Sequence, residues 1–270
     1  MSEVPIGVFD SGVGGLTVLR ALLKELPHEE FIYLGDTARL PYGTKSPATV
    51  ARYAATAAAA LAARGLKCLV VACNTASASS LPAMRERLGE VPIVGVIEPG
   101  AEAACEASAS GRIAVIATEG TVNGGAYQKA ILRRRSDARI LAIATQLFVA
   151  LAEEGLVSGP IALAVARHYL AALTEEPHDA PDTLVLGCTH FPMLLETIRA
   201  AVGPRMRIVD SAATTARQVR LRMESSGLAR TAGASAVRYL ASDGAERFAR
   251  VGSRFLARPI AASDVEVIDL

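Results

Sequence analysis

Residues 70–76 read Val-Val-Ala-Cys-Asn-Thr-Ala, and residues 185–192 read Val-Leu-Gly-Cys-Thr-His-Phe-Pro. In both stretches a short apolar run typical of a buried strand leads to a cysteine, and small polar residues that can cap a helix follow at once. The two stretches are copies of one local design, a strand that ends in a thiol at the mouth of a site. They predict two equivalent strands that carry Cys73 and Cys188 at their carboxyl ends.

The same alternation of apolar strand, polar tip and helix runs through the chain. Strands are predicted at 6–9, 31–34, 68–72, 93–97, 113–117, 140–144, 184–187, 208–209 and 237–240. Helical periodicity is found between them, for example at 16–26, 49–63, 81–88 and 161–173. Such alternation predicts an α/β fold in which mainly parallel sheets are flanked by helices. About nine strands in a chain of 270 residues fit two α/β units better than one.

No long linker rich in Pro, Gly or Ser separates the two predicted units. The stretches Glu98-Pro99-Gly100 and Gly203-Pro204 are the candidate crossover points between them. We therefore expect a discontinuous first α/β domain, residues 1–97 plus 208–270, and a second α/β domain over residues 98–207.

Composition narrows the classes of function. Lys and Arg number 28 and Asp and Glu number 27, so the net charge of +1 gives no support for a nucleic-acid or membrane-surface partner. The Ala-rich stretch 54–63 is too short to span a membrane, and no secretory signal pattern opens the chain. We expect a cytoplasmic protein. Its four cysteines show neither a C-x-x-C pair nor zinc spacing, which predicts free thiols and no metal.

Polar residues gather where the predicted strands end. They are Asp10-Ser11, Asp36, Cys73-Asn74-Thr75, Thr118, Cys188-Thr189-His190 and Asp210-Ser211. Ligands of open parallel sheets bind beyond the carboxyl ends of the strands, so these tips should converge on a site. The glycine-rich loop at 9–15 favours contact with a ligand over a purely structural turn. Its glycine spacing matches neither a dinucleotide loop nor a P-loop.

Each candidate residue also has a plain structural interpretation. A lone cysteine is often a small core residue, and this reading suits Cys68 and Cys105. For Cys73 and Cys188 the duplicated context favours reactive thiols, because helix starts depress the pKa of a thiol. His190 either caps a helix or assists Cys188. For Glu153 local evidence alone favours a helix-surface carboxylate, and Pro41-Tyr42-Gly43 reads equally well as a turn or as a ligand contact.

Two thiols that face one substrate from opposite sides suit a particular task. One can remove a proton from one face of a carbon while the other returns a proton to the opposite face. No lysine lies in a setting that suggests pyridoxal phosphate, so no cofactor is expected. Fixed hydrogen-bond donors would then have to stabilise the carbanion-like transition state.

Four motifs resemble those of the glutamate racemases, cofactor-independent enzymes that make D-glutamate for peptidoglycan. They are FDSGVGGLTV at 9–18, LGDTARLPYG at 34–43, ACNTA at 72–76 and LGCTHFP at 186–192. In this order they are highly specific, although the segment after residue 210 is much less distinctive. The resemblance implies two pseudo-symmetric α/β domains with the active site in the cleft between them, a small-molecule substrate and, as is common in the family, a homodimer.

The resemblance also assigns roles. It implies that Cys73 takes the α-proton from D-glutamate with help from Asp10. It implies that Cys188 takes the α-proton from L-glutamate with help from Glu153 and His190. The positions that match substrate-holding residues are Asp10, Ser11, Pro41, Tyr42, Gly43, Cys73, Asn74, Thr75, Thr121, Cys188, Thr189 and His190.

A few residues depart from the family pattern. Thr145-Gln146 and Ala150 stand where Cys-Pro and Pro are frequent, and Gly124 stands where Ser is common. These changes bear on the loop geometry beside Glu153 rather than on the chemistry. Two rival readings are a lyase-type relative that uses one cysteine, which would not need both thiols, and a regulatory protein that binds DNA gyrase. The absence of the N-terminal extension carried by precursor-activated relatives argues against that form of activation.

Overall fold

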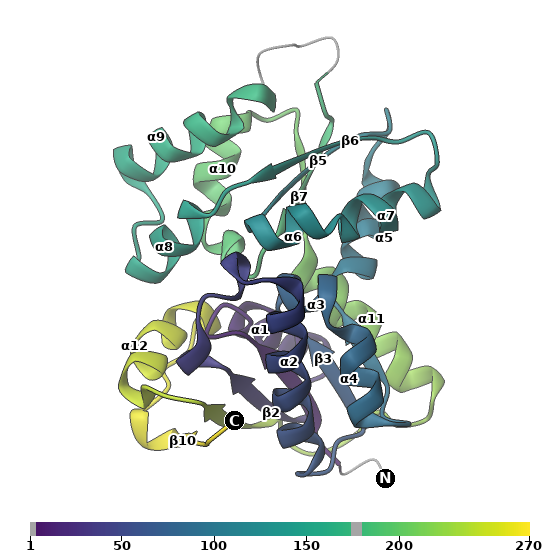
Figure 1. Ribbon diagram of the computed structural model, residues 1–270, viewed down its shortest axis with the longest axis vertical. Helices are drawn as coiled ribbons and strands as arrows, with labels where there is room; N and C mark the ends of the chain where they lie inside the picture. The colour runs from purple at the N-terminus through teal and green to yellow at the C-terminus, as the bar shows by residue number, and fades with distance from the viewer. Residues whose placement is uncertain (1–3, 174–179) are drawn as a thin grey trace.

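The computed structural model describes residues 4–173 and 180–270, which form two parallel sheets flanked by helices (Figure 1). The larger sheet contains β1 (Ile6–Asp10), β2 (Glu30–Gly35), β3 (Cys68–Val71), β4 (Ile93–Gly95), β9 (Ala236–Ala241) and β10 (Val265–Val267). The smaller sheet contains β5 (Arg112–Ala117), β6 (Arg139–Ala144), β7 (Thr183–Gly187) and β8 (Arg207–Asp210). The predicted α/β class is confirmed.

The two sheets repeat one strand order. The larger sheet runs β10-β9-β2-β1-β3-β4, and the smaller runs β6-β5-β7-β8. The first four strands are thus ordered 2-1-3-4, and strands β5 to β8 follow the same pattern. Strands β3 and β7, which lead to Cys73 and Cys188, are equivalent in the two sheets. Each is beside the point where the strand order reverses, and such points are where open parallel sheets bind ligands.

Helices cover both sheets. In the larger-sheet unit they are α1 (Leu16–Glu25), α2 (Pro47–Ala62), α3 (Asn74–Ser79), α4 (Leu81–Leu88), α11 (Ser211–Ser225) and α12 (Ala245–Leu256). With the smaller sheet lie α5 (Ile97–Ala107), α6 (Glu119–Gly124), α7 (Ala126–Arg134), α8 (Leu147–Glu154), α9 (Gly159–Leu170) and α10 (Leu195–Val202). Single 3₁₀ turns occur at Thr37–Arg39, Tyr42–Thr44, Ala171–Leu173, Phe191–Leu194 and Ala262–Asp264.

Local chemistry explains where these elements begin and what they bury. Helix α2 starts with Ser46, whose hydroxyl accepts the Thr49 N–H at 3.3 Å, and with Pro47 in the first turn. Its buried positions, mostly alanine, let the helix approach the sheet closely. Strands β1 and β3 are buried along their whole length because helices cover both faces of the sheet, which explains their continuous apolar sequence.

The structure corrects several details of the predicted elements. The strand expected at 93–97 ends at Gly95, because α5 already begins at Ile97. Strand β10 was not predicted, since Val265–Val267 has three residues, two of them exposed. Each of the four cysteines has a free thiol; Cys68 is buried as expected, whereas Cys105 is half-buried against the core.

One of the two predicted crossover points is wrong. Helix α5 does connect β4 of the larger sheet to β5 of the smaller one. Gly203-Pro204 instead joins α10 to β8 within the smaller-sheet unit. Gly203, with φ of +81°, ends α10, so this Gly-Pro pair is a helix stop. The domain limits of 1–97 with 208–270 and 98–207 stay a prediction. Strand β8 pairs with β7 in the smaller sheet.

Within residues 4–173 and 180–270, every helix is either too short or too polar to cross a membrane.

Candidate active site

Cys73 lies at the junction of β3 and α3. It is the N-cap residue of α3, where its Sγ accepts the Ala76 N–H at 3.4 Å and lies 3.5 Å from the Ser11 Oγ. Only 5% of the residue is exposed. Burial raises the pKa of the Cys73 thiol to about 12, and the nearby Asp10 carboxylate acts in the same direction. The protonated thiol is therefore the resting form of this cysteine.

Asp10 ends β1 and stands beside this thiol. Its Oδ2 accepts the Gly12 N–H at 2.9 Å. Burial raises the pKa of the Asp10 carboxyl, against the opposing effect of the positive charge on His190. A buried carboxyl of this kind can hold or pass a proton, because its two protonation states are closer in energy than those of an exposed one.

Cys188 is the first member of a chain of three groups. Its Sγ lies 3.8 Å from the His190 Nδ1, and the His190 Nε2 lies 3.1 Å from the Glu153 Oε1. Burial alone would lower the pKa of His190, but the hydrogen bonds to Cys188 and Glu153 outweigh burial and raise it to about 10. The hydrogen bond from His190 lowers the pKa of Glu153. The imidazole is thus positively charged at neutral pH, and its Nδ1 faces the Cys188 Sγ.

Glu153 reaches this position from the last turn of α8 and is held from the other unit. Its Oε2 accepts a hydrogen bond from Arg247 at 2.8 Å, and its backbone carbonyl accepts one from Arg254 at 2.6 Å. Both arginines belong to α12. The reading of Glu153 as a helix-surface carboxylate is therefore wrong, because α12 and His190 cover its side chain, leaving 14% of it exposed.

Hydroxyl and amide groups line the Cys73 side of the site. The Oγ1 atoms of Thr75, Thr118 and Thr121 lie 2.9 to 3.2 Å from one another and join the two units. The Asn74 Oδ1 accepts a hydrogen bond from Tyr127 at 2.8 Å, which leaves the buried Asn74 Nδ2 without a partner among the described residues. An amide donor of this kind at the wall of a cavity is available to a ligand.

The segment 40–43 is both a turn and a wall of the site. The Tyr42 hydroxyl donates to the Asp36 Oδ2 at 2.6 Å, and this buried bond holds the turn. Gly43 packs so tightly that a Cβ atom on it would stand within 3.0 Å of the Thr118 side chain. The two readings of Pro41-Tyr42-Gly43 therefore do not exclude each other.

These groups surround one cavity of about 630 Å³ between the two units. Most of the residues singled out from the sequence line it: Ser11, Pro41, Tyr42, Gly43, Cys73, Asn74, Thr75, Glu153, Cys188, Thr189 and His190. Asp10 and Thr121 do not line it, although the Thr121 hydroxyl is hydrogen-bonded to Thr75 and Thr118, which do. The lining also includes Leu40, Thr118, Gln146, Leu147, Val149, Ala150, Tyr169 and Arg247.

Sequence reasoning did not select most of this additional lining. Gln146 and Ala150 were noted only as departures from a family pattern, and both line the cavity. Thr118 was recognised only as a strand tip. Arg247 carried no signal, because it lies in the least distinctive part of the chain. Of the other two departures, Thr145 is fully buried and Gly124 lies elsewhere.

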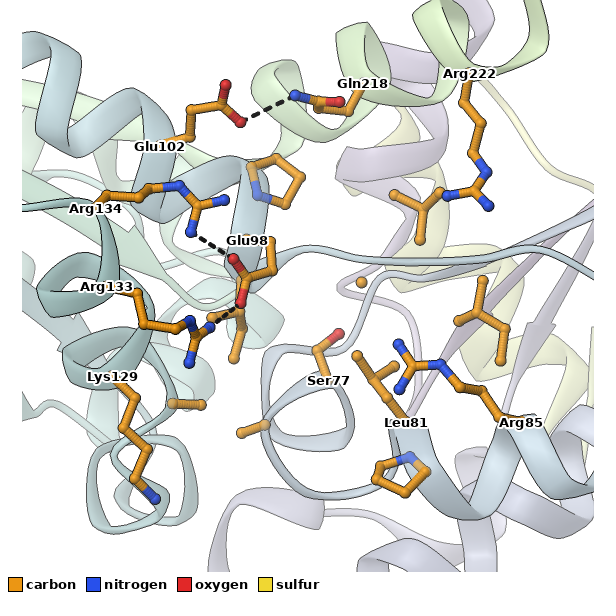
Figure 2. A pocket seen from close by; sticks show the side chains of 18 of the residues that line it. Ser77, Leu81, Arg85, Glu98, Glu102, Lys129, Arg133, Arg134, Gln218 and Arg222 are labelled. Atoms are coloured by element: carbon orange, nitrogen blue, oxygen red, sulfur yellow. Dashed lines mark hydrogen bonds and ion pairs between the residues drawn. The ribbon is translucent and has the colours of Figure 1, made fainter. Parts of the chain in front are cut away.

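Gly124 lines a larger cavity of about 1130 Å³, which shares no lining residue with the first (Figure 2). Its charged side chains are Arg85, Glu98, Glu102, Lys129, Arg133, Arg134 and Arg222. Glu98 lies between Arg133 and Arg134 and pairs with both, and Glu102 accepts a hydrogen bond from Gln218 at 3.0 Å. None of the described residues that line this cavity is a cysteine, whereas Cys73 and Cys188 both line the smaller one.

Comparison with known proteins places these features in context. Residues 6–219 match the family described as Asp/Glu/Hydantoin racemase. A glutamate racemase from Geobacter metallireducens is 50% identical over 93% of this chain and 92% of its own length. Glutamate racemase from Francisella tularensis, solved in complex with D-glutamate, superposes with a TM-score of 0.92 at 33% identity and covers 100% of this chain and 98% of its own. The Thermus thermophilus enzyme, solved with β-chloro-D-alanine, gives 0.88 at 44% identity, again over 100% and 98%.

Proposed function

Because the chain belongs to the Asp/Glu/Hydantoin racemase family, and within it to the glutamate racemases, which are isomerases, we propose that Cys73 and Cys188 interconvert L-glutamate and D-glutamate as two opposed bases. One observation carries this proposal. The two thiols follow equivalent strands of two sheets, β3 and β7, and line one cavity. Inversion at Cα needs a base on one face and an acid on the other, and thiols contributed by two different units supply that arrangement.

The ionisation states of the residues in the site support different roles for the two thiols. The raised pKa of Cys73 keeps it a thiol, and the charged His190 stands beside the Cys188 Sγ. In this resting form Cys188 takes the α-proton from L-glutamate while Cys73 delivers a proton to the opposite face. Once D-glutamate has formed, Cys188 carries the proton and Cys73 is the thiolate. The reverse reaction starts from that state. Asp10 assists Cys73, and His190 with Glu153 assists Cys188.

Fixed hydrogen-bond donors take the place of an electron sink. The α-proton of an amino acid is very weakly acidic, and its removal builds negative charge on the substrate carboxylate. Around the cavity stand the free Asn74 Nδ2 and the hydroxyls of Ser11, Thr75 and Thr189. These groups are held by the fold before substrate arrives, so little reorganisation is needed when the charge develops.

We further propose that the D-glutamate supplies peptidoglycan synthesis, which is the use that the family resemblance implies. The predicted homodimer, the cytoplasmic location and the absence of a cofactor stay predictions.

The test is racemisation by the purified chain, followed by circular dichroism from either enantiomer in a buffer with chelator and without pyridoxal phosphate. We expect activity in both directions. A single turnover starting from α-deuterated L-glutamate in ordinary water should give D-glutamate without the deuterium, because the second thiol delivers a different proton. Transfer of the original deuterium to the product would show one base serving both faces, and loss of activity on removing metal or pyridoxal phosphate would refute cofactor independence.

A further inference from the structure

The ion pair between Arg247 and Glu153 joins the two units at the edge of the reactive cavity. Glu153 ends α8 beside the smaller sheet, and Arg247 lies in the first turn of α12 in the larger-sheet unit. Figure 1 shows α8 and α12 on the same side of the molecule, one in each unit. The residues are 94 positions apart in the chain, and both line the cavity.

The two oxygens of the Glu153 carboxylate serve different partners. Oε1 faces the His190 Nε2 at 3.1 Å, and Oε2 accepts from the Arg247 Nη2 at 2.8 Å. With Oε2 held by the guanidinium, rotation of the carboxylate is restricted and Oε1 stays directed at the imidazole. The positive charge of Arg247 also favours the ionised carboxylate that an imidazolium needs as its partner.

We propose that Arg247 is a positioning residue for proton transfer at Cys188, which it influences through Glu153 and His190. This inference rests on the proposed two-base function. The cation that orients the acid–base chain of one unit comes from the other unit, so the Cys188 half of the site is complete only when α8 and α12 are in contact. The assisting groups of the Cys73 half, Asp10 and Ser11, lie in the same unit as the thiol, so their placement beside it does not require contact between α8 and α12.

If the Arg247–Glu153 ion pair served only to hold the two units together, its loss would change folding stability rather than the chemistry at Cys188. The Arg247 side chain is 53% exposed, so its ion pair adds little to the free energy of folding. The Arg254 hydrogen bond to the Glu153 carbonyl remains as a backbone anchor when Arg247 is replaced. Loss of Arg247 should therefore change the Cys188 chemistry while both halves stay folded.

Racemisation itself cannot reveal this asymmetry. Enantiomers have equal free energies, so kcat/KM must be the same in both directions for every variant. Elimination from 3-chloroglutamate separates the halves. A thiolate takes the α-proton, the Cβ–Cl bond breaks as chloride leaves, and the enamine formed tautomerises to an imine that water hydrolyses to 2-oxoglutarate and ammonia. The L-configured analogue reports Cys188 as the base, and the D-configured analogue reports Cys73.

The experiment compares Arg247→Gln, Arg247→Lys and Arg250→Gln in the full chain. Arg250 is exposed on the same helix and forms no ion pair with any described residue, so it controls for net charge. For Arg247→Gln we expect elimination from the L analogue to fall about threefold to tenfold and elimination from the D analogue to stay within about twofold. Arg247→Lys should restore part of the loss, and Arg250→Gln should match the wild type.

The effect of salt is a second readout, because salt screens the half-exposed ion pair between Arg247 and Glu153. Raising KCl from about 0.05 M to about 0.5 M should slow L elimination more in the wild type than in Arg247→Gln. Equal loss of both eliminations, or no loss, would overturn the role of Arg247. Failure of the two-base proposal would look different, since the Cys188→Ala variant would then still eliminate from the L analogue. Thermal unfolding of each variant verifies that it is folded.

Discussion

Gly14 lies directly against His190. A Cβ atom on Gly14 would stand within 3.0 Å of the imidazole Cε1 and Nδ1 and of the Thr189 Oγ1. Gly14 belongs to the loop after β1 and His190 to the loop after β7, so loops from the two sheets meet with no side chain between them. Beside this contact the Thr17 hydroxyl donates to the Thr189 carbonyl at 2.9 Å. The loop that carries Cys188 therefore rests on the glycine loop of the other unit.

Gly14→Ala should lower kcat/KM for racemisation by about tenfold to a hundredfold, because the added methyl group displaces His190 from its line between Cys188 and Glu153. The measurement is the initial rate with each enantiomer. Gly124→Ala is the matched control, since its Cβ would meet nothing closer than the Ala78 Cβ at 3.8 Å and should leave the rate unchanged. Wild-type activity in Gly14→Ala would mean that the two loops separate easily.

Cys73→Ala and Cys188→Ala should each lower racemisation by about a thousandfold or more while the fold stays intact, because each thiol is half of the proton exchange. The two variants should fail differently. Cys73→Ala should lose elimination from D-3-chloroglutamate and keep some from the L analogue, and Cys188→Ala should show the reverse. If both variants lost both eliminations equally, the assignment of opposed bases would be wrong.

Asp10→Asn should slow elimination from the D analogue about tenfold and leave elimination from the L analogue nearly unchanged. Its amide oxygen can still accept the Gly12 N–H, but the site loses the buried carboxyl beside Cys73 that holds or passes a proton. Asp137→Asn provides the control, because Asp137 is a surface residue with an exposed side chain. An unchanged D elimination in Asp10→Asn would remove Asp10 from the mechanism.

His190 should make folding stability depend on alkaline pH. Its folded pKa of about 10 lies above the ordinary value near 6.5, so the folded state binds the proton more tightly than the unfolded chain. The resulting stabilisation is complete below about pH 6.5 and is lost as the pH rises through about 10. The free energy of unfolding in urea, measured across this range, should therefore fall more steeply for the wild type than for His190→Asn. Parallel curves for the two proteins would contradict the raised pKa.

Aspartate should be a poor substrate. A side chain one methylene shorter cannot place both carboxylates on the donors while Cα stays between the thiols, and such a misfit costs about 1–3 kcal/mol or more. The measurement is kcat/KM for L-aspartate against L-glutamate, and we expect glutamate to be favoured by at least about tenfold. Similar values for the two amino acids would show that the site does not discriminate side-chain length.

The amino-acid sequence by itself determined the α/β class, the approximate positions of most strands and the two thiols. These features depend on local patterns: a run such as Leu-Val-Val before Cys73 is a buried strand wherever its helices pack, and a helix start after the cysteine needs only the next few residues. The duplication of that pattern around Cys188 was enough to predict that both cysteines serve one site.

Only the tertiary structure decided which side chains stand beside the thiols and which sheet each strand joins. Local sequence favoured a solvated Glu153, yet Arg247, 94 residues further on, holds this carboxylate toward His190. Strand β8 belongs to the smaller sheet because it pairs with β7, which no pattern around residues 207–210 reveals. Hydrogen bonds and ion pairs between distant segments depend on how whole elements pack. Sequence periodicity reports only which face of an element is buried, whereas packing decides what that face meets.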